Sequence, residues 1–304
     1  MTQSVTILMA TLNGGKYLEC QLKSIFQQSH KNWRLIISDD GSVDDTLNII
    51  NDFIFSNPNC NVKLLKGPQL GFAQNFLNML KYVDTDYACF CDQDDIWLPD
   101  KLSYSISKLT SRSVPSVYGS RTLLIDAKGS FLGKSPKFKK PAVFRNALVQ
   151  SIAGGNTMLL NAPAINLLSK VYSKGYIPVS HDWWVYLLIS GAGGEILYDS
   201  CPKVFYRQHE KNIIGSNKSF VGRIYRIRLL LLGQYKLWTD INIDILLKVS
   251  YILTYENKKI LDEFVRARKL PLFKRYSLMR QIGLYRQTWF GNLAFQLCIL
   301  LNKI

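Results

Sequence analysis

The sequence has few of the features that mark membrane-spanning, secreted or zinc-binding proteins. No apolar run among its 304 residues is long enough to cross a bilayer, and the N-terminus lacks the basic-then-apolar pattern of a signal peptide. Six cysteines are scattered, and the pair Cys89 and Cys91 has no second pair at the spacing of a zinc site. We therefore expect a cytoplasmic protein with reduced thiols.

The glycine-rich loops that usually bind nucleotide phosphates are also absent. Asn13-Gly14-Gly15 follows the first expected strand, but the further glycine of dinucleotide sites and the lysine of P-loops are missing. The sequence has neither a Gly-x-Ser-x-Gly turn nor a helix with paired histidines. A nucleotide bound here would need another positive charge for its phosphates, which a carboxylate-bound cation supplies.

Acidic residues are scarce toward the C-terminus. The formal net charge is +16, and residues 211–304 hold 17 Lys or Arg against 5 Asp or Glu. Basic residues alternate there with Leu, Ile, Tyr and Trp, and the apolar stretch Trp289–Leu301 is too short to span a bilayer. Such helices suit an anionic membrane surface, and the alternative is a solvated helical subdomain. Nucleic-acid binding also fits the charge, although no helix-turn-helix, RRM-like or zinc pattern is present.

Apolar runs of strand length alternate with amphipathic helical segments in the first third of the chain, which is typical of a doubly wound α/β unit. The expected strands are Val5–Ala10, Trp33–Ser38, Val62–Leu65 and Tyr87–Cys91. The expected helices are Tyr17–Gln28, one that begins at Asp44-Asp45-Thr46, Gly71–Tyr82 and Leu98–Leu109. Farther on we expect helices at Ala164–Tyr172, from His181 with Ser180 as N-cap, and from Gly222 to the end, and short strands at Ile196–Tyr198 and Lys203–Tyr206.

Polar side chains follow three of these strands, at the sheet edge where α/β proteins bind ligands. They are Thr11 and Asn13, then Asp39 and Asp40, and then Asp92, Asp94 and Asp95. Adjacent carboxylates at the end of a buried strand repel each other unless a cation compensates, and oxygen ligands favour Mg²⁺ or Mn²⁺. The alternative for Asp95 is the N-cap of the helix that follows, and Asp44 and Asp45 are expected to be helix-start acids.

Several short motifs in a fixed order resemble the nucleotide-sugar glycosyltransferases of family 2, which have the GT-A fold. In the N-terminal half they are Ala10-Thr-Leu-Asn13, Ser38-Asp-Asp-Gly-Ser42 with Asp44-Asp-Thr46, Gly71-Phe-Ala-Gln-Asn75 and Cys91-Asp-Gln-Asp-Asp95. Gly155-Asn-Thr-Met158, His181-Asp-Trp183 and Tyr206-Arg-Gln-His209 with Asn212 resemble the branch that builds bacterial surface polysaccharides such as O-antigen. The resemblance covers about residues 4–215.

The resemblance implies a role for each matching residue. Asp182 would be the catalytic base, and Asp94, Asp92 and His209 would hold Mn²⁺ or Mg²⁺. The nucleotide-sugar would contact Thr11, Asn13, Asp40, Asn75, Asp92 and Gln93. The acceptor would contact Gly155, Asn156, His181 and Trp183. His181 departs from the acidic residue that many relatives have before the base.

The expected activity is an inverting transfer of one sugar, because the Gln-x-x-Arg-Trp motif and membrane spans of processive synthases are missing. The donor would be UDP-glucose or UDP-galactose, with dTDP-rhamnose as the alternative, and the acceptor an undecaprenyl-diphosphate-linked saccharide. A sugar nucleotidyltransferase is the competing enzyme class. We expect a GT-A catalytic domain at 1–215 (donor side 1–110, acceptor side 111–215). A basic helical region at 216–304 would associate with the inner face of the bacterial inner membrane.

Overall fold

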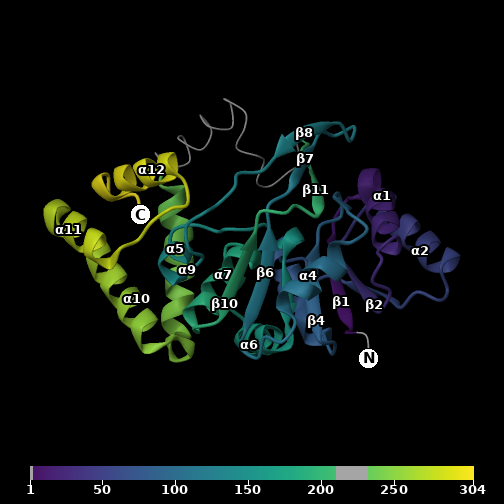
Figure 1. Ribbon diagram of the computed structural model, residues 1–304, viewed down its shortest axis with the longest axis horizontal. Coiled ribbons are helices and arrows are strands. Elements are labelled where there is room, and N and C mark those ends of the chain that lie inside the picture. Colours follow the sequence, from purple (N-terminus) through teal and green to yellow (C-terminus); the bar gives the residue numbers. More distant parts are fainter. Residues whose placement is uncertain (1–2, 210–231) are drawn as a thin grey trace.

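A seven-stranded sheet forms the centre of the structure, a computed structural model that describes residues 3–209 and 232–304 (Figure 1). The strand order is β10-β6-β9-β4-β1-β2-β3, and only β9 runs antiparallel to its neighbours β4 and β6. The strands are β1 (Val5–Thr11), β2 (Trp33–Asp39), β3 (Val62–Lys66), β4 (Tyr87–Cys91), β6 (Ser116–Ser120), β9 (Leu159–Asn161) and β10 (Glu195–Asp199). The four strands expected in the first third, and the α/β class, are confirmed.

Helices cover both faces of this sheet, which explains why its strands are almost continuously apolar. Successive residues of β1 point to opposite faces: Ile7 and Met9 belong to one buried cluster and Leu8 to the other. The first cluster includes residues of α1 (Gly15–Phe26) and α4 (Lys101–Leu109). The second includes residues of α3 (Phe72–Met79), α6 (Ala162–Tyr172) and α7 (His181–Gly191). Helix α2 (Thr46–Ser56) follows β2 and contacts α1.

A second, four-stranded sheet lies beyond the carboxyl ends of the parallel strands (Figure 1). Its order is β5-β11-β7-β8, with β5 (Ile96–Trp97), β11 (Val204–Arg207), β7 (Leu123–Ile125) and β8 (Phe131–Lys134). β5 follows the acidic motif of β4 directly, and β11 leads into His209. Pairing of β5 with β11 therefore brings two halves of the expected site together.

The capping role considered for Asp95 is wrong. The residues after Asp95 pair with β11 as a short strand, and the next helix, α4, begins only at Lys101 with Asp100 at its N-cap. Asp95 is fully buried before β5, and its carboxylate accepts hydrogen bonds from Asn156 and Arg207 instead. Ser180 does occupy the N-cap position of α7, although its side chain makes no capping hydrogen bond.

Residues 232–304 form the helices α9 (Gln234–Lys248), α10 (Tyr255–Arg268), α11 (Leu272–Ile282) and α12 (Trp289–Leu300). No helix in the described ranges combines the length and apolarity that a membrane span needs. The buried cluster that contains Leu188 of α7 also contains Leu246, Phe264 and Ile299, so these helices share a core with the sheet. The expected helical start at Gly222 and the expected domain boundary at 215/216 lie outside the described residues.

Asn146 fixes the C-terminal part to the helices beside the sheet. Its buried amide donates to Tyr285 O at 2.9 Å and accepts from Tyr186 Oη at 2.9 Å and from Gln287 Nε2 at 3.1 Å. These bonds join α7 to the chain segment between α11 and α12.

We predict that Asn146→Ala lowers the free energy of unfolding by roughly 3 kcal/mol, because it leaves buried donors and acceptors without partners. Urea unfolding followed by circular dichroism measures this, with the exposed Asn48→Ala as a control expected to change it by less than about 0.5 kcal/mol. Wild-type unfolding should be one transition because the core is shared. Separate early unfolding of the C-terminal helices would contradict the shared core.

Candidate active site

Thr11 and Asp39 join the ends of β1 and β2. The two residues are register partners, and Thr11 Oγ1 donates to Asp39 Oδ1 at 2.9 Å. The other oxygen of Asp39 accepts from the backbone N–H groups of Gly41 and Ser42 at 3.1 and 2.8 Å. The buried Asp39 therefore fixes the loop after β2, a role that the sequence pattern did not separate from that of its neighbour Asp40.

The other residues expected around the nucleotide also brace these loops. Asp40 Oδ1 accepts from Gln69 N at 2.7 Å, and Asn13 Oδ1 accepts from Val43 N at 2.9 Å. Asn75 is buried in α3 and donates to Ser38 O at 2.8 Å, which places it beneath the end of β2.

Gln93 joins the loop after β4 to the loop after β1. Its amide accepts from Leu12 N at 2.9 Å and donates to Leu12 O at 3.0 Å. A Cβ at Gly14 would lie 2.2 Å from Gln93 Oε1, so glycine is required for this close approach. The ends of β1, β2 and β4 thus form one braced edge.

Carboxylates from two distant parts of the chain meet at this edge. Burial, together with the nearby negative charges of Asp94 and Asp182, raises the pKa of Asp92 to about 8. Asp182 lies in the first turn of α7, which is far from β4 along the chain. Like charges gathered in partly buried surroundings are the arrangement that a bound cation or a shared proton stabilises.

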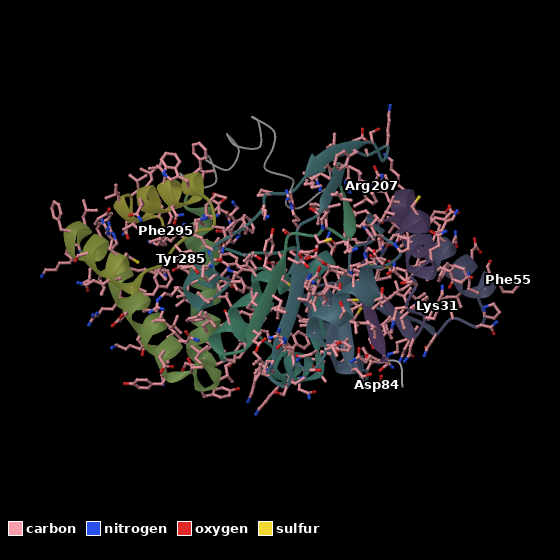
Figure 2. The ribbon with its side chains drawn as sticks, in the orientation of Figure 1. Lys31, Phe55, Asp84, Arg207, Tyr285 and Phe295 are labelled. Carbon is pink, nitrogen blue, oxygen red and sulfur yellow. The ribbon has the colours of Figure 1, made fainter. Side chains whose placement is uncertain are left out.

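His209 lies against Asp94. Its Nε2 is 2.7 Å from Asp94 Oδ2, and its ring stacks on Tyr17 of α1 with 5.2 Å between the centroids. Arg207 donates from Nε to Asp94 O at 3.0 Å, and its guanidinium carbon is 4.7 Å from the centre of the Tyr17 ring. Figure 2 shows Arg207 between the second sheet and α1. Tyr17 had not been singled out from the sequence as a site residue, and Arg207 had been named only as part of the Tyr206-Arg-Gln-His209 motif, without a role of its own.

Asp95 and Asn156 form a buried pair under the carboxylates. Asn156 Nδ2 donates to Asp95 Oδ2, and Arg207 N donates to Asp95 Oδ1 at 3.2 Å. Burial raises the pKa of Asp95 well above its usual range, with the charges of Asp92 and Asp94 contributing. The pair therefore connects the short helical turn Gly155–Thr157 to β11 and to the acidic motif.

His181 and Trp183, expected at the acceptor, are both buried. The His181 ring packs against Phe76 and Phe90 with centroid distances of 4.2 and 4.8 Å, and a Cβ at Gly155 would lie 2.0 Å from its Nε2. Trp183 Nε1 donates to Ala147 O at 2.7 Å. In this structure the two residues support α7 around Asp182, and contact with an acceptor stays a prediction.

Asp94 and His209 lie in contact and Asp92 lies near Asp94, and the role of these three residues as metal ligands stays a prediction. Among residues 3–209 and 232–304, no group of three or more His, Cys, Asp or Glu is arranged as a preformed metal site. Mg²⁺ and Mn²⁺ commonly use one or two carboxylates and complete their shell with substrate phosphates and water. The mutual repulsion that raises the pKa of Asp92 is the feature that a cation would relieve.

Comparison with known proteins decides the family. Residues 6–161 match the family model described as glycosyl transferase family 2. The chain belongs to glycosyltransferase family 2. The dTDP-rhamnosyl transferase RfbG of Shigella flexneri is 31% identical over 233 residues, which cover 73% of this chain and 78% of that protein. The WfgD protein of Escherichia coli, named as a UDP-Glc:alpha-D-GlcNAc-diphosphoundecaprenol beta-1,3-glucosyltransferase, is 30% identical over 43% of this chain and 49% of its own length.

Solved structures show the fold of this family 2 chain. The mannosyltransferase PcManGT from Pyrobaculum calidifontis, in complex with GDP-Man and Mn²⁺, matches with a TM-score of 0.56 at 14% identity. That match covers 100% of this chain and 86% of the other. TarS 1–349 of S. aureus, in complex with UDP-GlcNAc, also matches with a TM-score of 0.56 at 16% identity. That match covers 92% of this chain and 88% of the other. The GT-A fold is therefore confirmed, and Asn212 of the resembling motif lies outside the described residues.

We predict that His181 makes the family 2 chain less stable in acid. Burial lowers the pKa of His181 to about 4, whereas an unfolded histidine titrates near 6.5. Between these values the unfolded state binds more protons, so stability falls as the pH falls from about 6.5 toward 4. The free energy of unfolding of the wild type should fall by about 2 kcal/mol between pH 7 and pH 5 because of His181, and the His181→Leu variant should lack this decrease. Urea titrations at both pH values measure it, and parallel changes in the two proteins would contradict the buried neutral ring.

Proposed function

We propose that this family 2 glycosyltransferase moves a single sugar from a nucleotide-sugar to a saccharide carried on undecaprenyl diphosphate, with inversion at the anomeric carbon. The observation that supports it most directly is the proximity of Asp182 to the Asp92–Asp94 motif, which raises the pKa of Asp92. A base and a phosphate-binding motif held side by side are what a direct displacement requires.

The donor is proposed to be dTDP-rhamnose or a UDP-hexose, glucose or galactose. RfbG is named as a dTDP-rhamnosyl transferase and WfgD as a UDP-glucose enzyme, and both are similar to this chain. The name of WfgD also specifies a diphosphoundecaprenol-linked acceptor, which motivates the lipid-linked acceptor proposed here. Synthesis of a bacterial surface polysaccharide such as O-antigen, at the cytoplasmic face of the inner membrane, is consistent with that acceptor.

The residues divide the reaction between them. Asp182 takes the proton from the acceptor hydroxyl as its oxygen attacks the anomeric carbon, and one base on the face opposite the leaving group gives inversion. Asp94 and His209, with Asp92 beside them, hold Mn²⁺ or Mg²⁺ near the donor diphosphate. The cation, when bound, neutralises charge on the departing diphosphate. Asp40, Thr11 and Asn13 shape the loops that would surround the nucleoside.

A donor panel tests the proposed reaction. Purified protein is incubated with UDP-glucose, UDP-galactose, UDP-GlcNAc or dTDP-rhamnose and a synthetic lipid-diphosphate N-acetylhexosamine, with Mn²⁺, with Mg²⁺ or with EDTA. We expect one donor to give a product one sugar longer, with the opposite anomeric configuration, only in the presence of a divalent cation. Transfer that persists in EDTA would remove the metal from the proposal, and retained configuration would remove the single-displacement mechanism.

Asp182→Asn is predicted to lower kcat by 10²-fold or more, because general-base catalysis contributes about 10²–10⁴-fold. The variant should keep the wild-type dissociation constant for the nucleoside diphosphate, since Asp182 acts on the acceptor. The exposed Asp52→Asn is the matched control and should keep wild-type turnover. Steady-state kinetics and calorimetric titration measure the two quantities. A kcat within threefold of the wild type would exclude Asp182 as the base.

A further inference from the structure

Helix α12 exposes a continuous apolar face. Successive residues of an α-helix are rotated by about 100° around its axis. The large exposed side chains of α12, together with Leu301 just after its end, therefore fall within about one third of the helix circumference. They are Trp289, Phe290, Leu293, Leu297, Leu300 and Leu301. The opposite side of α12 packs into the core through Phe295, Cys298 and Ile299. Trp289 and Phe290 are 71% and 77% exposed, and they share one helix face with four exposed leucines, unlike a single exposed aromatic residue such as Phe55.

Basic residues precede and follow this face in the sequence, and none lies within it. The sequence has no charged residue between Arg286 and Lys303, the two cations that flank α12. Residues 264–304 hold eight Lys or Arg and no Asp or Glu. A surface with an apolar centre and basic neighbours is complementary to anionic lipid headgroups over an apolar layer. Two copies packed face to face would instead bring two basic segments together, and Asp240, the acid that this segment contacts, is already paired with Arg268, so charge complementarity favours the lipid surface over a dimer.

The position of α12 relates it to the active site. Figure 1 shows α12 at the same side of the molecule as the second sheet, toward which the parallel strands direct their carboxyl ends. The helix has 12 residues and is about 18 Å long, too short to span a bilayer but suited to lie in its interface. A bilayer in contact with α12 would thus lie on the side of the molecule where the carboxylates meet.

We propose that α12 is an interfacial membrane helix. Its exposed face enters the headgroup region of an anionic bilayer through Trp289, Phe290 and the leucines, while the basic residues around it contact lipid phosphates. This docking goes beyond the proposed transfer reaction, because it requires only lipid and neither donor nor acceptor.

Flotation with vesicles tests the docking. The full-length protein is mixed with neutral phosphatidylcholine vesicles or with vesicles containing 30% phosphatidylglycerol, at 50 mM and 500 mM NaCl. We expect binding to the anionic vesicles at low salt, and weaker binding both at high salt and to neutral vesicles. No binding to anionic vesicles at low salt would overturn the proposal.

A matched pair of variants tests the assignment to α12. Phe290→Gln should weaken partitioning to anionic vesicles by about tenfold or more, because burying one aromatic side chain away from water changes a binding constant by at least that factor. Phe55→Gln changes an 88% exposed phenylalanine of α2, at the far end of the molecule in Figure 2, and should change partitioning less than twofold. Equal effects of the two variants would overturn the assignment. So would a vesicle-free dimer in analytical ultracentrifugation that Phe290→Gln dissociates.

Activity separates this proposal from the proposed function. Both variants should retain wild-type turnover with a water-soluble acceptor, because neither residue lies near Asp182 or the Asp92–Asp94 motif. Loss of vesicle binding with intact soluble turnover supports the docking role. Vesicle binding by a protein without any transferase activity would leave the docking in place and refute the transfer reaction.

Discussion

Repulsion between carboxylates is the constraint on which the active site depends. Asp92, Asp94, Asp95 and Asp182 gather at one end of β4, and burial with mutual repulsion raises the pKa of Asp92 and of Asp95. Keeping such groups together costs free energy in the protein without substrate. The arrangement becomes favourable when positive charge arrives, and the diphosphate of a nucleotide-sugar cannot approach the carboxylates without it. Binding of a cation and binding of the donor would therefore depend on each other.

The surrounding structure holds the acidic motif in place through Asp94 and Asp95. β11 pairs with β5, and through Arg207 it bonds to Asp94 and to Asp95, while His209 at its end meets the Asp94 carboxylate. On the other side, Asn156 anchors Asp95 from the turn after α5 (Phe144–Ala147). A family 2 chain without a phosphate-binding glycine loop thus uses a small second sheet to position its acidic motif.

The periodicity of the sequence was sufficient to predict the first four strands, their helices and the sheet edge at which the polar residues gather, because buried parallel strands leave continuous apolar runs. It could not distinguish Asp95 as a helix cap from Asp95 as a buried partner of Asn156. The strand Ile96–Trp97 is too short to leave a pattern, and its partner β11 is more than a hundred residues away. His181 and Trp183 show the same limit: the sequence did not reveal that both are buried, because the packing of Phe76 and Phe90 around His181 depends on tertiary structure, and their contact with an acceptor stays a prediction.

The most direct test of this account is calorimetric titration of the nucleoside diphosphates UDP and dTDP into the protein with Mn²⁺ and with EDTA, for the wild type and for Asp94→Asn. The account predicts that Mn²⁺ tightens binding of the preferred diphosphate to the wild type by tenfold or more, and that Asp94→Asn loses most of this gain while its affinity in EDTA stays near that of the wild type. Equal affinity of the wild type in Mn²⁺ and in EDTA would contradict it.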